Sequence, residues 1–218
     1  MVDFEQARRT MVDSQLRTNG VIDRAIIAAM GRVPRELFVP ETRRSVAYID
    51  DVHDFREVAP GRSMPAPAPF ARLLQLAEIG STDRVLDVGA TTGYGAAVIG
   101  ELAREVVAIE RNATLVEAAR SHLRSLGMGN VTVIESAHTA APEGPFDVIL
   151  LEGAVDAVPE GLVGVLAEGG RLVCLIRSGM VAVAHVFVNS GGSVTGRAEF
   201  NASLPPLDVM AAEETFAF

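Results

Sequence analysis

Two acidic residues, Asp87 and Glu110, flank a glycine-containing turn in a pattern typical of nucleotide pockets. Each lies at the end of a short apolar run that predicts a buried strand, and a helical segment begins after Gly93. This arrangement places the turn from Gly89 to Gly93 at the carboxyl end of the first strand, where doubly wound sheets bind ligands. An acid about 20 residues past such a turn typically binds the two hydroxyl groups of a ribose. The spacing therefore favours an adenosine-containing ligand.

The glycine pattern narrows the choice of nucleotide. Dinucleotide cofactors require G-x-G-x-x-G, but the second and third glycine positions here hold Thr91 and Tyr94. S-adenosylmethionine has no phosphate groups and carries a cationic amino-acid tail, so a carboxylate near the turn, supplied by Asp87, favours it. A competing interpretation is that the glycines only make a tight turn and that Glu110 is a solvated acid.

Composition excludes several other classes of function. The net charge of −9 argues against nucleic-acid binding, which depends on neutralising phosphates. The N-terminus has no apolar signal core, and no apolar run approaches the roughly 18 residues of a membrane span. The four histidines show no metal-ligand spacing, and the single Cys174 cannot form an intramolecular disulfide. We therefore expect a cytoplasmic protein that binds no metal, membrane or nucleic acid.

Alternating apolar segments predict the architecture. We expect an α/β fold: a Rossmann-like, seven-stranded, mostly parallel sheet with helices on both faces, an antiparallel C-terminal strand and an N-terminal helical extension. Residues 1–69 would form the extension and a substrate or cofactor loop, and residues 70–218 the Rossmann-like core. Tyr48–Pro69 reads as an irregular ordered loop or lid. Its charged residues, which predict a net negative approach to the site, are Asp50, Asp51, Asp54, Arg56, Glu57 and Arg62.

Several segments together resemble one family. VPRELFVP (Val33–Pro40), Ala47-Tyr48, DVGATTGYGAAV (Asp87–Val98) and GPFDVILLEGAVDAVP are similar to segments of the protein-L-isoaspartate O-methyltransferases, in the same order. VPRELFVP is the most specific of these segments, because it has no generic nucleotide-binding role. The resemblance covers most of the chain and implies a single S-adenosylmethionine-dependent methyltransferase domain over residues 1–218. It further implies methyl transfer to isoaspartyl residues of damaged proteins or peptides, which is a repair reaction.

The resemblance also assigns a cofactor site, but no catalytic residue. A carboxylate acceptor is already ionised at neutral pH and needs no general base. Ser63 is the hydroxyl nearest to the place of the family's loop serine. The residues expected to bind the cofactor are Ser63, Met64, Asp87, Gly89, Ala90, Gly93, Glu110, Arg111, Glu135 and Ser136.

Two residues depart from the family pattern. Pro65 stands where the family's G-x-T-I-S-x-P loop has a serine, and it has neither a hydroxyl nor a backbone donor. Thr91 replaces the middle glycine of the turn, where a β-branched residue with positive φ would be strained. These departures leave an alternative: a degenerate member that binds S-adenosylmethionine or S-adenosylhomocysteine but methylates another acceptor, or has a non-catalytic binding role. The sequence does not indicate the oligomeric state.

Overall fold

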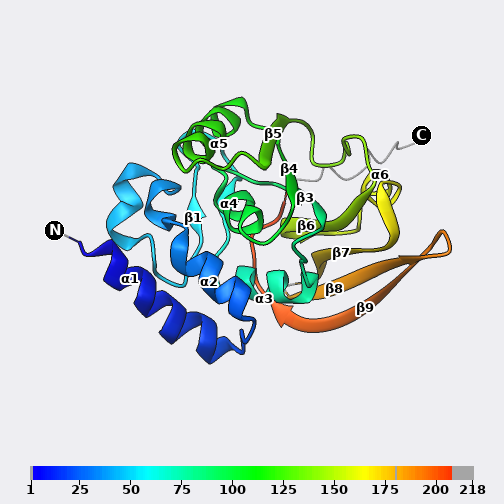
Figure 1. The fold of residues 1–218 in the computed structure, drawn as a ribbon, viewed down its shortest axis with the longest axis horizontal. Coiled ribbons are helices and arrows are strands. Elements are labelled where there is room, and N and C mark those ends of the chain that lie inside the picture. Colours follow the sequence, from blue (N-terminus) through cyan, green and yellow to red (C-terminus); the bar gives the residue numbers. More distant parts are fainter. Residues whose placement is uncertain (1, 180, 208–218) are drawn as a thin grey trace.

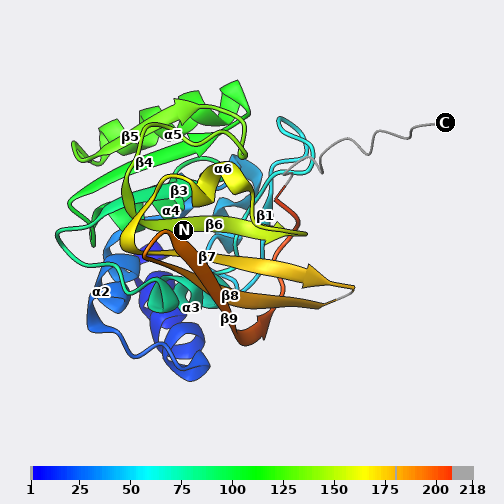
Figure 2. The ribbon, with the colours of Figure 1, turned by 90° about the vertical axis from the view of Figure 1, so that its right-hand side faces the viewer.

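A seven-stranded sheet organises the protein. The computed structural model describes residues 2–179 and 181–207, and its strand order is β5-β4-β3-β6-β7-β8-β9. Strands β3 to β7 pair in parallel, whereas β7 with β8 and β8 with β9 are antiparallel (Figure 2). This confirms the fold class predicted from the sequence. The strands are β3 (Arg84–Val88), β4 (Glu105–Glu110), β5 (Val131–Glu135), β6 (Phe146–Val155), β7 (Leu166–Ser178), β8 (Val181–Ser190) and β9 (Ser193–Ala202).

Helices cover the sheet unequally. Alternate strand residues face opposite sides, because successive side chains of a strand point to opposite faces. Val85 and Val106 pack on the side of α3 (Pro67–Ala77), α4 (Tyr94–Gly100) and α5 (Ala113–Ser125). Leu86 and Val107 face the other side, where α6 (Glu160–Val163) is a single short turn. Helices therefore lie on both faces, with most of the helical cover on one.

Local signals set the helix bounds. The side chain of Asn112 caps α5 by accepting a hydrogen bond from the Leu115 N–H, and Gly127 follows the helix with a φ of 69°. The second helix begins at Arg24. Asp23 is the reason, since its side chain accepts hydrogen bonds from two N–H groups of the first turn.

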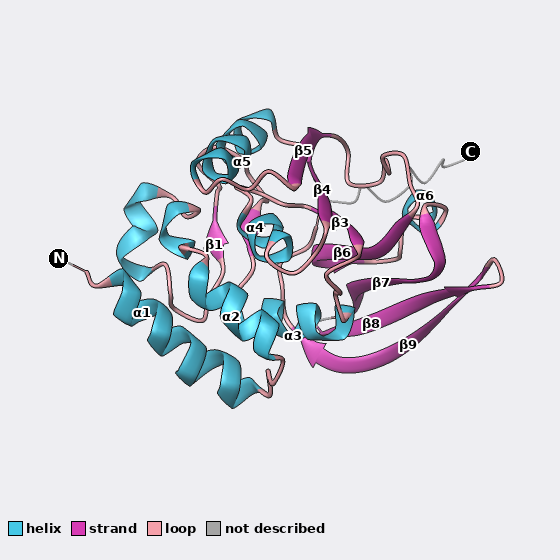
Figure 3. Cartoon of the chain, viewed as in Figure 1, coloured by secondary structure: helices cyan, strands magenta, loops and turns pink. Residues whose placement is uncertain are grey.

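The N-terminal extension packs against α3 and α4, on the helix-covered face of the sheet, and lies far from the turn between β8 and β9 (Figures 1 and 3). Its elements are α1 (Phe4–Met11), a π turn (Val12–Leu16), a 3-10 turn (Arg17–Asn19), α2 (Arg24–Arg32) and two further 3-10 turns (Arg35–Leu37 and Glu41–Val46). The loop that follows is less irregular than predicted. It contains a two-stranded antiparallel sheet of β1 (His53–Asp54) and β2 (Ser63–Met64), and α3 begins at Pro67.

Arg35 joins the extension, the loop and the core. Its side chain is fully buried, its Nε donates to the Ala47 carbonyl at 2.9 Å, and its Nη2 donates to the Pro65 carbonyl at 2.6 Å. Its guanidinium carbon lies 4.7 Å from the centroid of the Tyr94 ring at the start of α4. These contacts give VPRELFVP a structural role: its arginine holds the loop in place. That role requires no nucleotide-binding pattern in the segment. Pro65 lacks an N–H, but its carbonyl is used by Arg35.

Arg35→Lys should therefore lower the free energy of unfolding by roughly 2–4 kcal/mol, because an ammonium cannot reach two divergent carbonyls from one buried position. Denaturant unfolding of the full chain measures this. Arg44→Lys, at an exposed position of the same segment, is the control and should change little. Equal stability of the two variants would contradict the anchoring role.

Candidate functional site

The register of the parallel strands brings the predicted acids to one edge of the sheet. Asp87 of β3 pairs with Ala108 of β4, and Glu110 pairs with Glu135 of β5. The Gly89 and Ala90 N–H groups donate to the Ile109 carbonyl at 2.9 and 3.2 Å, which ties the turn to β4. The turn and both acids thus lie at the carboxyl ends of β3 and β4, as the spacing indicated.

The turn takes an unusual backbone conformation. Gly89 and Gly93 have φ values of 89° and 92°, and Thr91 has a φ of 48°. The strain anticipated for a β-branched residue is therefore present. Thr91 is buried, and its hydroxyl finds no partner among residues 2–179 and 181–207. What the turn gains is a hydrogen bond of 3.1 Å from the Thr91 N–H to Oε2 of Glu110.

Thr91→Gly should leave the free energy of unfolding unchanged or raise it by up to about 1 kcal/mol. Relief of positive φ, worth about 1–2 kcal/mol, offsets the loss of the buried methyl group. Thr92→Gly is the matched control. Thr92 is the next residue and is also buried, but its φ is not positive and its hydroxyl donates to the Phe38 carbonyl. That control should lose at least about 1 kcal/mol. Similar losses at both positions in thermal unfolding would refute the strain.

Glu110 is a buried carboxylate with a full set of donors. Its Oε1 accepts from the backbone N–H groups of Arg111 and Asn112 at 2.9 and 3.1 Å. Its Oε2 accepts from the Thr91 N–H and from Nη2 of Arg62, the latter at 2.7 Å. Burial acts to raise the pKa of Glu110, but the adjacent His138 and the Arg62 guanidinium outweigh it and lower that pKa to about 2. The interpretation of Glu110 as a solvated acid is therefore wrong.

Arg62 is the residue that sequence reasoning missed. We counted it among the charges at the mouth of the site, but its side chain is only 4% exposed. Its Nε lies 3.3 and 3.2 Å from the two oxygens of Glu110, and its Nη2 donates to the Gly89 carbonyl at 2.9 Å. A Cβ on Gly89 would lie 3.1 Å from Nη2 of Arg62 and 2.4 Å from Cδ1 of Leu207. Arg62 and Leu207 therefore fill the space in front of the turn.

Asp87 faces a second acid that the sequence did not single out. Glu152 is buried on β6, and the two carboxyl groups lie within hydrogen-bonding reach of each other. Within the described part of the chain, no N–H or hydroxyl group donates to any of their four oxygens. Gly95 makes room for this pair, since a Cβ there would lie 1.7 Å from Oε1 of Glu152.

The raised pKa values of Asp87 and Glu152 favour a proton shared by the two carboxyl groups near neutral pH. Burial raises the pKa of Asp87 to about 7, although the hydrogen bond with Glu152 acts to lower it. Burial and the neighbouring Asp87 raise the pKa of Glu152 well above its ordinary value. Two adjacent carboxyl groups in a low-dielectric site cannot both ionise readily.

This proton makes stability depend on pH. Because both acids have a higher pKa when folded than when unfolded, unfolding releases protons, and the free energy of unfolding falls as pH rises from about 4 to about 7. Glu152→Gln removes one acid and supplies an N–H donor to Asp87. It should stabilise the protein by on the order of 1–3 kcal/mol at pH 8 and by much less at pH 5. Exposed Glu117→Gln is the control, and an equal effect of Glu152→Gln at both pH values would contradict the shared proton.

The remaining predicted residues lie around this edge. The Ser136 N–H donates to the Glu110 carbonyl at 3.0 Å, and the side chains of Glu135 and Arg111 are exposed. Ser63 and Met64 form β2, immediately after Arg62, with Met64 buried opposite His53. His138 is buried, with Nε2 3.7 Å from Oε1 of Glu110, a proximity that no local sequence pattern signals.

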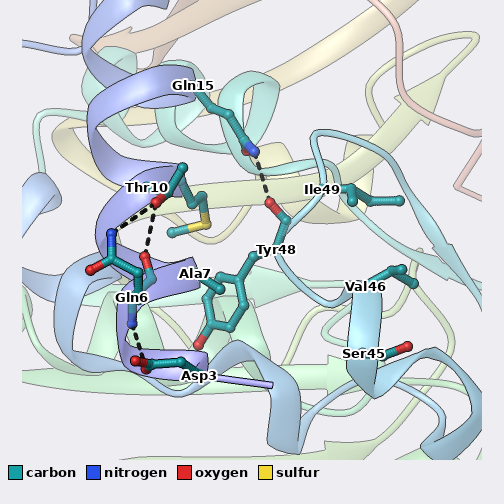
Figure 4. A pocket seen from close by; sticks show the side chains of 10 residues that line it. Asp3, Gln6, Ala7, Thr10, Gln15, Ser45, Val46, Tyr48 and Ile49 are labelled. Carbon is teal, nitrogen blue, oxygen red and sulfur yellow. Dashed lines mark hydrogen bonds between the residues drawn. The ribbon is translucent and has the colours of Figure 1, made fainter. Parts of the chain in front are cut away.

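Two cavities in the described part of the chain lie away from the turn. One, of about 390 Å³, is lined by α1 and the Ser45–Ile49 segment, where the Gln15 side chain donates to the Tyr48 carbonyl (Figure 4). The other, of about 440 Å³, is lined by residues between Pro40 and Val58. Neither is lined by Glu110 or by the glycine turn. Across residues 2–179 and 181–207, no helix has the length and apolar character needed to cross a membrane.

The fold and the site define a Rossmann-like domain in which a glycine turn and two buried acids meet at the carboxyl ends of β3 and β4. A family model described as protein-L-isoaspartate(D-aspartate) O-methyltransferase matches residues 6–207, and the chain belongs to that family.

Relatives of known name agree with this assignment. A protein-L-isoaspartate O-methyltransferase of Koribacter versatilis is 39% identical over 194 residues, covering 88% of this chain and 86% of the relative. One from Methylorubrum populi is 41% identical over 170 residues, covering 78% and 79%.

Solved structures share the fold. A crystal structure titled as a protein-L-isoaspartate O-methyltransferase from Plasmodium falciparum, in complex with S-adenosyl-L-homocysteine, is 22% identical, with a TM-score of 0.78 over 92% of this chain and 97% of that one. A second structure titled protein-L-isoaspartate O-methyltransferase is 25% identical, with the same TM-score, over 92% of this chain and 65% of that one.

Proposed function

We propose that this protein transfers a methyl group from S-adenosylmethionine to the carboxylate of isoaspartyl residues in damaged proteins or peptides. The family match over residues 6–207 carries the proposal. The placement of Glu110 and the glycine turn at the ends of adjacent parallel strands supports it, because this is where such sheets bind nucleosides.

The residues fit the cofactor as a set of donors and acceptors. Glu110 would accept hydrogen bonds from both ribose hydroxyls, and the Gly89–Gly93 turn, with Ala90, would allow a close approach of the ligand. Glu135 and Ser136, at the end of β5, would border the adenine, with Arg111 beside them. Ser63 and Met64 would close the site from the loop. Two parts of the fit require movement: Arg62 and Leu207 fill the space in front of Gly89, and Arg62 bonds the Glu110 carboxylate.

The reaction asks this chain mainly for positioning. When bound, S-adenosylmethionine supplies a methyl group already activated by its sulfonium. The acceptor carboxylate is ionised at neutral pH, so the protein has no proton to remove from it. What remains for the protein is to align the acceptor oxygen with the methyl group and to exclude water. We therefore assign positioning roles and no catalytic residue.

Several finer expectations stay predictions. They are a cytoplasmic location, an isoaspartyl peptide as acceptor bound beside the Tyr48–Pro69 loop, and no binding of nucleic acid. We further infer that residues 1–69 and 70–218 work as one domain. The contacts of Arg35 support this, since they connect the Ala47 and Pro65 carbonyls with the Tyr94 ring.

The full chain should methylate an isoaspartyl peptide at least about 100-fold faster than its aspartyl counterpart, as judged from kcat/KM. Release of S-adenosylhomocysteine together with base-labile methyl ester measures this. Glu110→Gln should lower kcat/KM on the isoaspartyl peptide by about 10–100-fold, because two ribose hydroxyls lose a charged acceptor.

Two outcomes would contradict the proposal in different ways. Equal rates on the two peptides would contradict the acceptor. Tight S-adenosylhomocysteine binding without turnover on either peptide would instead favour the degenerate member with another acceptor or a binding role.

A further inference from the structure

We propose that Arg62 is an internal competitor for the cofactor's ribose: in the free protein its guanidinium occupies Glu110, and it must leave before the cofactor binds. The inference rests on the proposed function, because it assigns the ribose to Glu110. It adds a gate that this chain's own loop supplies.

The first step is the hydrogen-bonding capacity of Glu110. An ionised carboxylate offers about four lone-pair sites. Three backbone N–H groups, those of Thr91, Arg111 and Asn112, already donate to it, and Arg62 donates from both Nε and Nη2. No acceptor site is left for a ribose hydroxyl while Arg62 stays, and its departure frees a site on Oε2.

The second step is which donor can leave. The three backbone N–H groups belong to the turn and to the junction of β4 with α5, so they are fixed by the sheet. Arg62 is instead a side chain on the loop. Its Nη2 also bonds the Gly89 carbonyl at 2.9 Å, so its departure frees the carboxylate and the part of the space in front of the turn that Leu207 does not fill.

The third step is whether the loop can move. The segment Phe55–Arg62 is closed by a few backbone bonds, among them Phe55 N–H to the Arg62 carbonyl at 2.9 Å and Arg62 N–H to the Ala59 carbonyl at 3.0 Å. Arg56, Glu57 and Val58 at its tip are exposed. Gly61, next to Arg62, has a φ of 79°, and a glycine can leave this conformation without the steric restriction that a side chain would add.

The consequence is a trade between stability and affinity. The ion pair supplies the buried Glu110 carboxylate with a cation in the free protein, but every cofactor molecule must displace it. The apparent affinity equals the affinity of the open site multiplied by the fraction of molecules in which the site is open. Arg62→Gln should therefore lower the free energy of unfolding of the free protein and raise its affinity for the cofactor. If Arg62 were only structural, the substitution would lower both the stability and the affinity.

Calorimetric titration of the full chain with S-adenosylhomocysteine, together with thermal unfolding without ligand, tests this. Arg62→Gln should bind on the order of tenfold more tightly than the parent and unfold several degrees lower. Arg62→Lys, which keeps a cation but not the paired bonds, should fall between them and serves if Arg62→Gln does not fold. Arg56→Gln, on the exposed tip of the same loop, is the matched control and should match the parent in both measurements.

Equal or weaker binding by the Arg62 variants would overturn the inference and leave the cofactor assignment intact. Absence of binding by all the proteins, the control included, would overturn the cofactor assignment, and this inference with it.

Discussion

The buried carboxylate of Glu110 is the constraint on which the rest of the site depends. A charge taken out of water needs partners that restore what hydration supplied. Here the turn, the start of α5 and the loop each contribute donors to that one group. The strained Thr91 backbone and the inward course of Arg62 both make sense as ways of directing N–H groups at Glu110. The carboxylate that we propose to bind the ribose thus also orders the segments around it.

Arg35 fixes the segments outside the sheet relative to this site. By bonding the carbonyls of Ala47 and Pro65, it fixes both ends of the loop that carries Arg62. Phe38, from the same VPRELFVP segment, packs edge-on against Tyr94 with ring centroids 5.7 Å apart. The most specific segment of the sequence is therefore structural in its contacts and functional in its effect, because it sets where the loop can reach.

Local patterns sufficed for the fold but not for the interior of the site. The apolar runs predicted the sheet. The position of Asp87 and Glu110 at the ends of neighbouring strands predicted that they lie at one edge of it. Arg62, Glu152 and His138 escaped notice because their burial depends on partners far away in the chain. In sequence, Arg62 is one charge in an acidic, Pro-rich loop, and Glu152 is one polar residue in an apolar run. Only the packed structure sets one against Glu110 and the other against Asp87.

The central claim, that Glu110 binds either Arg62 or the ribose, can be observed directly in the Arg62 Nε–H resonance. In the free, ¹⁵N-labelled protein we expect, besides the signal of the buried Arg35, a slowly exchanging arginine Nε–H signal that is missing from Arg62→Gln. Saturation with S-adenosylhomocysteine should abolish its protection and return it to the range of exposed arginines. A signal that keeps its position and protection at saturation would show that the guanidinium stays on Glu110 with the ligand bound, and would contradict the account.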